Sequence, residues 1–165
     1  MRRITHPSPE ARMDIPTLEP LPFDAPWDYE LRIPRDPRSP RIARLTLRAV
    51  LGDHGLAELT DRAELLATEL ATNAVRHTDG PALLRFQWLH PVLRVSVGDT
   101  RPSLPLVPGH RPARTALHAE NGRGLLILDV LADRWGGCGT GDGHPGKTIW
   151  FELALAKPEP EPSAA

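Results

Sequence analysis

The sequence contains a single cysteine, Cys138, among 165 residues. One cysteine excludes an internal disulfide and a zinc site built from several cysteines, and it fits a reducing compartment. An excess of charge of one sign is also lacking, because the formal net charge is -1 and the pI is about 6.7. Without a global basic field, we expect no direct nucleic-acid partner.

Long hydrophobic runs are absent as well. No stretch approaches the ~20 consecutive apolar residues that span a bilayer, so we expect no membrane partner. Arg2 and Arg3 are not followed by an apolar segment, which argues against a secretory signal and for a cytoplasmic protein. The histidines show no metal-ligand spacing and no HExxH motif, so a zinc site of that type is not expected.

What the sequence does contain is proline, with 19 residues that cluster at the two ends and in one internal stretch. Residues 1–26 predict a disordered proline-rich arm, residues 156–165 a disordered tail, and residues 27–155 a single domain. Residues 100–121 predict a loop of about twenty residues, longer than most structural loops. A lid over a ligand and a plain surface insertion explain this loop equally well.

Apolar patterning predicts an alternation of strands and helices within the domain. Runs rich in alternating or branched apolar residues predict strands at 27–33, 82–89, 92–97, 134–139 and 147–155. The second and third runs form a predicted hairpin around His90 and Pro91. Helical spacing predicts helices at 39–52, at 59–77 and directly after Gly124.

The first predicted helix carries its apolar repeat at Ile42, Leu45 and Ala49, with Leu51 as a further member. Five arginines lie on or just before this helix: Arg35, Arg38, Arg41, Arg44 and Arg48. They are explained either as a basic surface for an acidic protein or for phosphates, or more simply as a solvated helix face.

The second predicted helix combines an apolar stripe with a polar edge. The stripe consists of Ala63, Leu66, Ala67, Leu70 and Ala74. Glu69, Asn73 and His77 follow one another at spacings of four, so they share one edge of the helix beside this stripe. A carboxylate and an amide beside a core need partners, which a metal ion with a polyanionic ligand would provide. For this segment alone, an ordinary amphipathic helix is the simpler interpretation.

Two further motifs are weak when each is taken separately. Asp99 lies just past a predicted strand, where ligand-binding side chains often sit. Gly122 and Gly124 open a predicted apolar helix, and glycines at a helix start allow backbone N–H groups to approach an anion. The segment lacks the third glycine of a dinucleotide fingerprint and the GKT or GKS ending of a P-loop.

In their order and spacing, however, four segments resemble the N, G1, G2 and G3 boxes of the GHKL ATPase/kinase superfamily. They are ELATNAVRHT, VSVGDTRPSLP, NGRGLLIL and GKTIWFEL. Within the superfamily, the chain is most similar to the anti-sigma-factor serine/threonine kinases and to stand-alone ATP-binding regulatory proteins of actinomycetes. The resemblance covers residues 27–155. It implies a Bergerat-type two-layer α/β sandwich, with a mixed, mostly antiparallel sheet and helices on one face.

The resemblance also implies roles for individual residues, with ATP and Mg2+ as cofactors. Asn73 matches the asparagine that holds Mg2+, and Glu69 matches the acidic residue that orients or deprotonates the nucleophile. Asp99 matches the aspartate that accepts the adenine amine, and Thr148 matches the threonine that supports it. The remaining matches lie on the phosphates or at the end of the N box: Gly122, Gly124, Arg123 and His77, with Arg76 as a further phosphate contact.

One departure from the superfamily pattern is that Asp99 is followed by Thr100, Arg101 and Pro102 instead of glycines. The anti-sigma branch often has this looser form, which keeps the adenine assignment but argues against tight nucleotide binding. The resemblance implies transfer of the ATP γ-phosphate to a serine or threonine of an anti-sigma antagonist. The alternative is a non-catalytic module that sequesters a sigma factor or antagonist, with residues 39–52 as the contact helix. A homodimer is common in this branch.

Overall fold

The computed structural model describes residues 18–101, 122–140 and 145–156, with only the backbone for residues 122–125. Five strands form one sheet in the order β1-β2-β3-β5-β4, and each pairing is antiparallel. The strands are β1 (Trp27–Ile33), β2 (Ala82–Leu89), β3 (Val92–Asp99), β4 (Arg134–Gly139) and β5 (Lys147–Ala154). The expected sandwich is confirmed, although its sheet is antiparallel throughout the described strands and not mixed.

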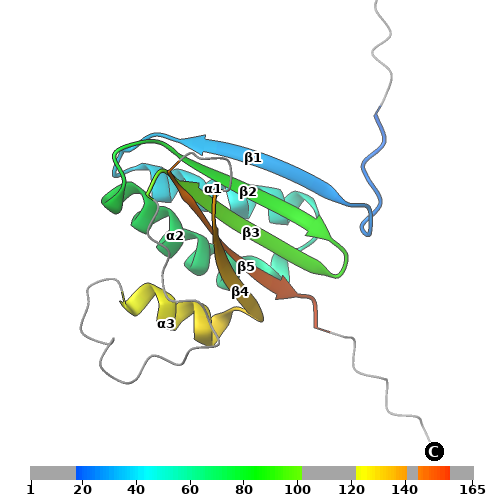
Figure 1. Ribbon diagram of the computed structural model, residues 1–165. Helices are drawn as coiled ribbons and strands as arrows, with labels where there is room; N and C mark the ends of the chain where they lie inside the picture. Colours follow the sequence, from blue (N-terminus) through cyan, green and yellow to red (C-terminus); the bar gives the residue numbers. More distant parts are fainter. Residues whose placement is uncertain (1–17, 102–121, 141–144, 157–165) are drawn as a thin grey trace, which may run out of the picture.

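The helices cover one face of this sheet (Figure 1). They are α1 (Ser39–Asp53), the short 3-10 turn η1 (Ala57–Leu59), α2 (Thr60–His77) and α3 (Gly122–Leu131). Alternation along β2 buries Leu84, Phe86 and Trp88 beneath the helices. The predicted stripe of α2 is confirmed, because all five of its residues are buried against the sheet. Helix α2 is therefore the central element of the helical layer.

The apolar repeat expected for α1 is wrong for Ile42, Leu45 and Ala49, which are exposed, and correct for Leu51, which is buried. Ile42 and Leu45 are 49% and 42% exposed, whereas Ala43, Leu47 and Leu51 are fully buried. The buried residues recur every four positions and begin with a small side chain, which suits close packing of α1 beside α2. Two large apolar side chains are thereby left on the outer surface of α1.

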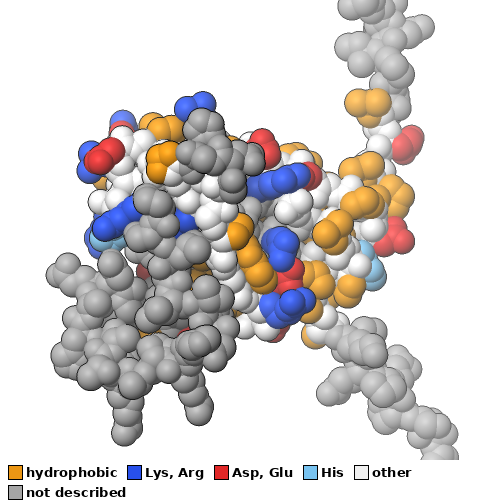
Figure 2. Space-filling model, viewed as in Figure 1, with side chains coloured by type: hydrophobic (Ala, Val, Ile, Leu, Met, Phe, Trp, Pro, Cys, Tyr) orange, Lys and Arg blue, Asp and Glu red, His pale blue; other side chains and the backbone are white. Residues whose placement is uncertain are grey.

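The other face of the sheet carries charged side chains interspersed with apolar ones (Figure 2). Asp28 on β1 pairs with Arg85 on β2, and Arg94 on β3 pairs with Glu152 on β5. The Arg94 guanidinium also lies 4.1 Å from the centre of the Trp150 ring, a cation–π contact. Cross-strand pairs of this kind let one face of an antiparallel sheet remain in water.

Several expected segments lie outside the described residues, namely 1–17 of the arm, 102–121 of the long loop, 141–144 of the glycine-rich turn and 157–165 of the tail. Residues 18–26 of the expected arm are described. Among them, Phe23 packs edge-on against Trp88, and its carbonyl oxygen accepts a 2.9 Å hydrogen bond from the Trp88 indole. In the described part of the chain, no helix has the length and apolar character needed to cross a membrane.

Candidate functional site

Helix α2 presents Glu69 and Asn73 at the boundary between core and solvent. Both side chains are half-buried, whereas His77 at the end of the helix is exposed. Neither Glu69 nor Asn73 has a hydrogen-bond or ion-pair partner among the described residues. Both side chains keep contact with solvent, so water or a ligand can satisfy their polar atoms. This edge of α2 is therefore available to bind a ligand.

The same edge of α2 faces helix α3. Arg62, in the first turn of α2, donates hydrogen bonds of 3.0 and 2.7 Å to the carbonyl oxygen of Leu131, the last residue of α3. Glu69 and Asn73 follow Arg62 by seven and eleven residues, close to two and three helical turns, so they lie on the side that Arg62 occupies. The edge predicted from sequence thus points toward the helix that begins with the two glycines.

Helix α3 extends back along α2 from the contact between Arg62 and Leu131. The two helices run in opposite directions, and their contact at Arg62 joins the beginning of α2 to the end of α3 (Figure 1). Helix α3 has ten residues, so it reaches back along α2 by about 14 Å. For antiparallel helices, this length extends from the level of Arg62 to about the level of residues 69–73 of α2. The prediction that the glycines open a helix is confirmed.

Asp99 ends β3 on the helix-covered side of the sheet, and its side chain is only 6% exposed. Its Oδ1 atom accepts a 3.0 Å hydrogen bond from Lys147 Nζ and a 2.8 Å hydrogen bond from the backbone N–H of Arg101. No described residue donates a hydrogen bond to the other carboxylate oxygen, Oδ2, so that atom can accept one from a ligand. The carboxylate expected to bind adenine is therefore neutralised by a lysine of the neighbouring strand.

Thr148, which was expected to support Asp99, lies on the opposite face of the sheet. It pairs with Gly98 in the β3–β5 register, and a Cβ placed on Gly98 would lie 3.4 Å from Thr148 Oγ1. Because successive side chains of a strand point to opposite faces, Thr148 and Asp99 are on different sides. The structure therefore brings Lys147, and not Thr148, to the carboxylate.

Sequence reasoning missed three residues around Asp99. Lys147 is the opposite residue in the strand register and forms the ion pair. Gly146 precedes it, and a Cβ there would lie 2.7 Å from the backbone oxygen of Asp99. Arg101 Nη1 donates a 3.4 Å hydrogen bond to the carbonyl oxygen of His77 and so joins this strand end to the end of α2. In the sequence, the only indication of these contacts is the pair Gly146-Lys147 at the start of a predicted strand.

Magnesium is the metal that the resemblance implies for this edge. The described residues contain no group of three or more His, Cys, Asp or Glu side chains that could hold a metal by themselves. Glu69 and Asn73 nevertheless supply carboxylate and amide oxygens, the hard donors that Mg2+ prefers. Mg2+ commonly takes only one or two protein ligands, with waters and substrate phosphates as the others. The donor set therefore fits a magnesium ion that arrives together with a nucleotide.

An antiparallel sheet covered on one face by helices, with polar groups of α2, α3 and β3 at one end, is the architecture of the ATP-binding domains that the sequence resembles. The sequence profile of the family described as histidine kinase-like ATPase domain matches residues 33–151. The chain belongs to this family, which supports ATP binding and a regulatory role. No curated protein sequence matches the chain.

Proposed function

We propose that the protein is an ATP-dependent protein kinase that regulates an anti-sigma antagonist by phosphorylating one of its serine or threonine residues. The observation that supports this proposal is the polar edge of α2, on which Glu69 and Asn73 are half-buried without partners among the described residues and face α3. Glu69 and Asn73 come from α2, the two glycines from α3 and Asp99 from β3. Together they offer an acid–base group, a metal ligand, backbone donors for phosphate and an acceptor for adenine.

The chemistry assigned to the chain's own residues is limited to binding and one proton transfer. Asp99 accepts a hydrogen bond from the adenine amine, and the N–H groups at the start of α3 meet the phosphates. Glu69 accepts the proton of the protein hydroxyl as its oxygen attacks the γ-phosphorus. A new oxygen–phosphorus bond forms, the bond to the β-phosphate oxygen breaks, and ADP leaves. Asn73 would hold the magnesium ion, which would neutralise charge on the phosphates.

A second candidate is a binding module that holds ATP weakly and acts by sequestering a sigma factor or its antagonist. The Asp99–Lys147 ion pair favours this alternative. A carboxylate whose charge is already compensated by lysine gains less from an adenine amine, even though its Oδ2 atom receives no hydrogen bond from the described residues. Both candidates place the protein in the same regulatory setting, and they differ in nucleotide affinity and in catalysis.

Calorimetric titration with ATP and Mg2+ separates the two candidates. For the kinase, we expect binding by the wild type and a loss of about tenfold or more in the N73A variant, because a metal ligand is removed. The E69Q variant should keep most of the ATP affinity and lose γ-phosphate transfer to a purified antagonist protein by about 100-fold or more.

Gln87 offers a matched control, since it is a partly buried amide on the opposite face of the sheet. The Q87A variant should bind ATP-Mg2+ as the wild type does. Equal affinity of the wild type and N73A would overturn the metal assignment. No ATP binding by the wild type would reject the kinase and leave the sequestering module.

A further inference from the structure

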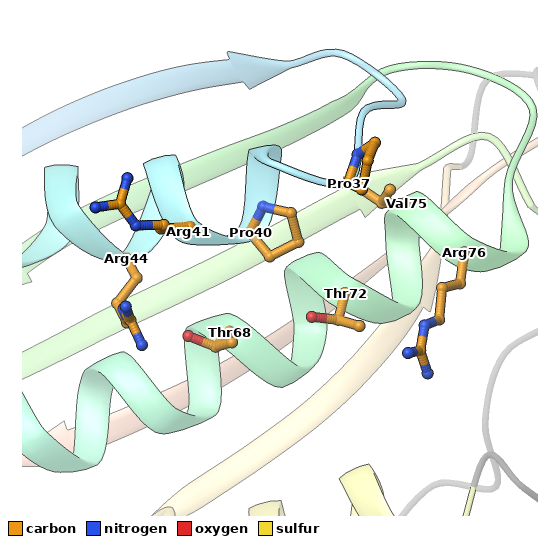
Figure 3. Close-up of a pocket in the computed structure, with 8 residues that line it drawn as sticks. All are labelled: Pro37, Pro40, Arg41, Arg44, Thr68, Thr72, Val75 and Arg76. Atoms are coloured by element: carbon orange, nitrogen blue, oxygen red, sulfur yellow. The ribbon is translucent and has the colours of Figure 1, made fainter.

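A cavity of about 370 Å³ lies between α1 and α2. Arg41 and Arg44 reach it from α1, and Thr68, Thr72 and Arg76 line it from α2 (Figure 3). Pro37, Pro40 and Val75 form an apolar end near the start of α1. We call this hollow the α1–α2 groove. Its lining combines cationic, hydroxyl and apolar groups.

The groove lies mainly on the flank of α2 that faces α1. Glu64 of α2 forms hydrogen bonds of 2.6 Å with Arg48 of α1, which marks the side of α2 that faces α1. Thr68 and Val75 follow Glu64 by four and eleven residues, so they share this side. Glu69 and Asn73 point instead toward α3. The groove is therefore centred on a different side of α2 from Glu69 and Asn73, and Arg76, seven residues after Glu69, lies at the boundary between the two sites.

The three arginines of the groove differ from most other arginines in their lack of acidic partners. Among the described residues, the guanidinium groups of Arg41, Arg44 and Arg76 form no ion pair. By contrast, six other arginines each pair with a carboxylate: Arg38, Arg48, Arg62, Arg85, Arg94 and Arg134. These arginines leave positive charge without a described counter-charge at the border of one hollow, which favours an anionic ligand there.

Apolar anchor points lie on the same two helices. Leu45 of α1 is 42% exposed, and Leu65 of α2 is 44% exposed. Leu45 follows Arg41 by four residues on α1, and Leu65 precedes Thr68 and Thr72 by three and seven residues on α2. Both leucines therefore lie on the outward faces that carry the groove residues. The surface offers leucine contacts beside arginine contacts.

From this combination we propose that the α1–α2 groove is the docking site for an acidic, amphipathic segment of a protein partner. Carboxylates of the segment pair with Arg41, Arg44 and Arg76, and its apolar side chains pack on Leu45, Leu65 and the proline end. The Thr72 hydroxyl, which has no hydrogen bond to the described residues, provides a further polar contact. This inference goes beyond nucleotide binding and specifies a surface and the chemistry of its partner.

A peptide fits this surface better than nucleic acid does. The net charge of the chain is -1, so the basic character is confined to the groove. Among the described residues that line the hollow, no aromatic side chain offers a surface on which a base could stack. Leucine and proline contacts beside arginines are characteristic of peptide recognition, in which an apolar helix face occupies a groove.

The test uses a fluorescein-labelled helical peptide with glutamates and leucines at spacings of three and four. A second peptide, with glutamine in place of each glutamate, controls for apolar binding. We expect the full-length protein to bind the acidic peptide and the double variant R41Q/R44Q to bind it about tenfold or more weakly. Amide chemical shifts of the wild type should change on α1 and α2.

The matched control is R32Q/R134Q, which removes two exposed positive charges from the sheet side of the molecule. It should bind the acidic peptide as the wild type does. The R41Q/R44Q variant should keep its ATP-Mg2+ affinity, which distinguishes failure of docking from failure of the ATP site. Equal binding of the two peptides, no binding by the wild type, shifts on the sheet face, or tighter binding of duplex DNA to the groove would each overturn the proposal.

Discussion

Asp99 is the residue whose environment says most about the candidate site. Its carboxylate is almost fully buried and is balanced by Lys147, which is 12% exposed, at a distance of 3.0 Å. A buried carboxylate without a counter-charge would be strongly unfavourable. Lys147 therefore supplies the counter-charge of Asp99, and the amine of a bound nucleotide would share this carboxylate with Lys147.

Replacing Lys147 by methionine tests the dependence of Asp99 on its partner. We expect K147M to lose about 2–4 kcal/mol of unfolding free energy, somewhat less than a fully buried pair would lose, because Asp99 is left unpaired. The double variant D99N/K147M should recover at least about 1 kcal/mol of this loss. Urea denaturation measures both values.

The R134M variant is the control, because it also replaces a basic residue of an ion pair by methionine. In this pair with Glu152, however, Arg134 is 76% exposed. We expect it to cost less than about 1 kcal/mol. If K147M were as stable as R134M, Asp99 would not need Lys147.

At the scale of secondary-structure elements, α2 connects the two sites. Its α3-facing edge carries Glu69 and Asn73, and its α1-facing edge lines the groove. Arg62 holds α3 in place by bonding to the carbonyl oxygen of Leu131 and to Asp133, 3.0 Å away. The start of α3 contributes the glycines of the candidate site, so the position of α3 matters for function.

Removing the Arg62 contacts should loosen α3 without unfolding the sheet. We expect hydrogen exchange of the amides of residues 126–131 to become about tenfold faster in R62M, because Leu131 at the end of α3 loses two hydrogen bonds and the following Asp133 loses one. The R85M variant, which loses an ion pair between β1 and β2, should leave α3 unchanged. Unaltered exchange in R62M would show that packing alone holds α3.

At the scale of the whole molecule, the net charge is close to zero, but paired and unpaired charges lie on different parts of the surface. Ion pairs join neighbouring elements over much of the surface, while the groove keeps unpaired arginines. The hydrogen bond from Arg38 holds the pKa of Asp36 down, from 3.8 to about 2. The hydrogen bond from Arg85 likewise lowers the pKa of Asp28.

These lowered pKa values predict how stability depends on pH. A carboxylate with a lowered pKa in the folded state stabilises the fold above its unfolded pKa and loses this effect as pH falls. The wild type should therefore melt a few degrees at most above the D28N/D36N variant near pH 5. The difference should disappear between about pH 4 and pH 2, as thermal melts across this range would show. A difference that stays constant throughout would contradict the assignment to these two carboxylates.

The sequence by itself determined the elements and their order. Apolar periodicity located α2 and its buried stripe, and branched apolar runs located the strands. These predictions succeeded because secondary structure and burial depend on local spacing of side chains. The Glu69–Asn73 edge was found for the same reason, since residues four apart must share a helix face.

Only the tertiary structure decided which partners meet. Strand register placed Lys147 beside Asp99 and turned Thr148 to the other face, because a shift of one residue reverses every side chain. Close packing of α1 and α2 buried Ala43 and Leu47 and left Leu45 outside. The same packing gathered Arg41, Arg44 and Arg76 around one hollow, although Arg76 is far from the other two in sequence. Contacts between distant segments depend on how whole elements pack, which local spacing does not specify.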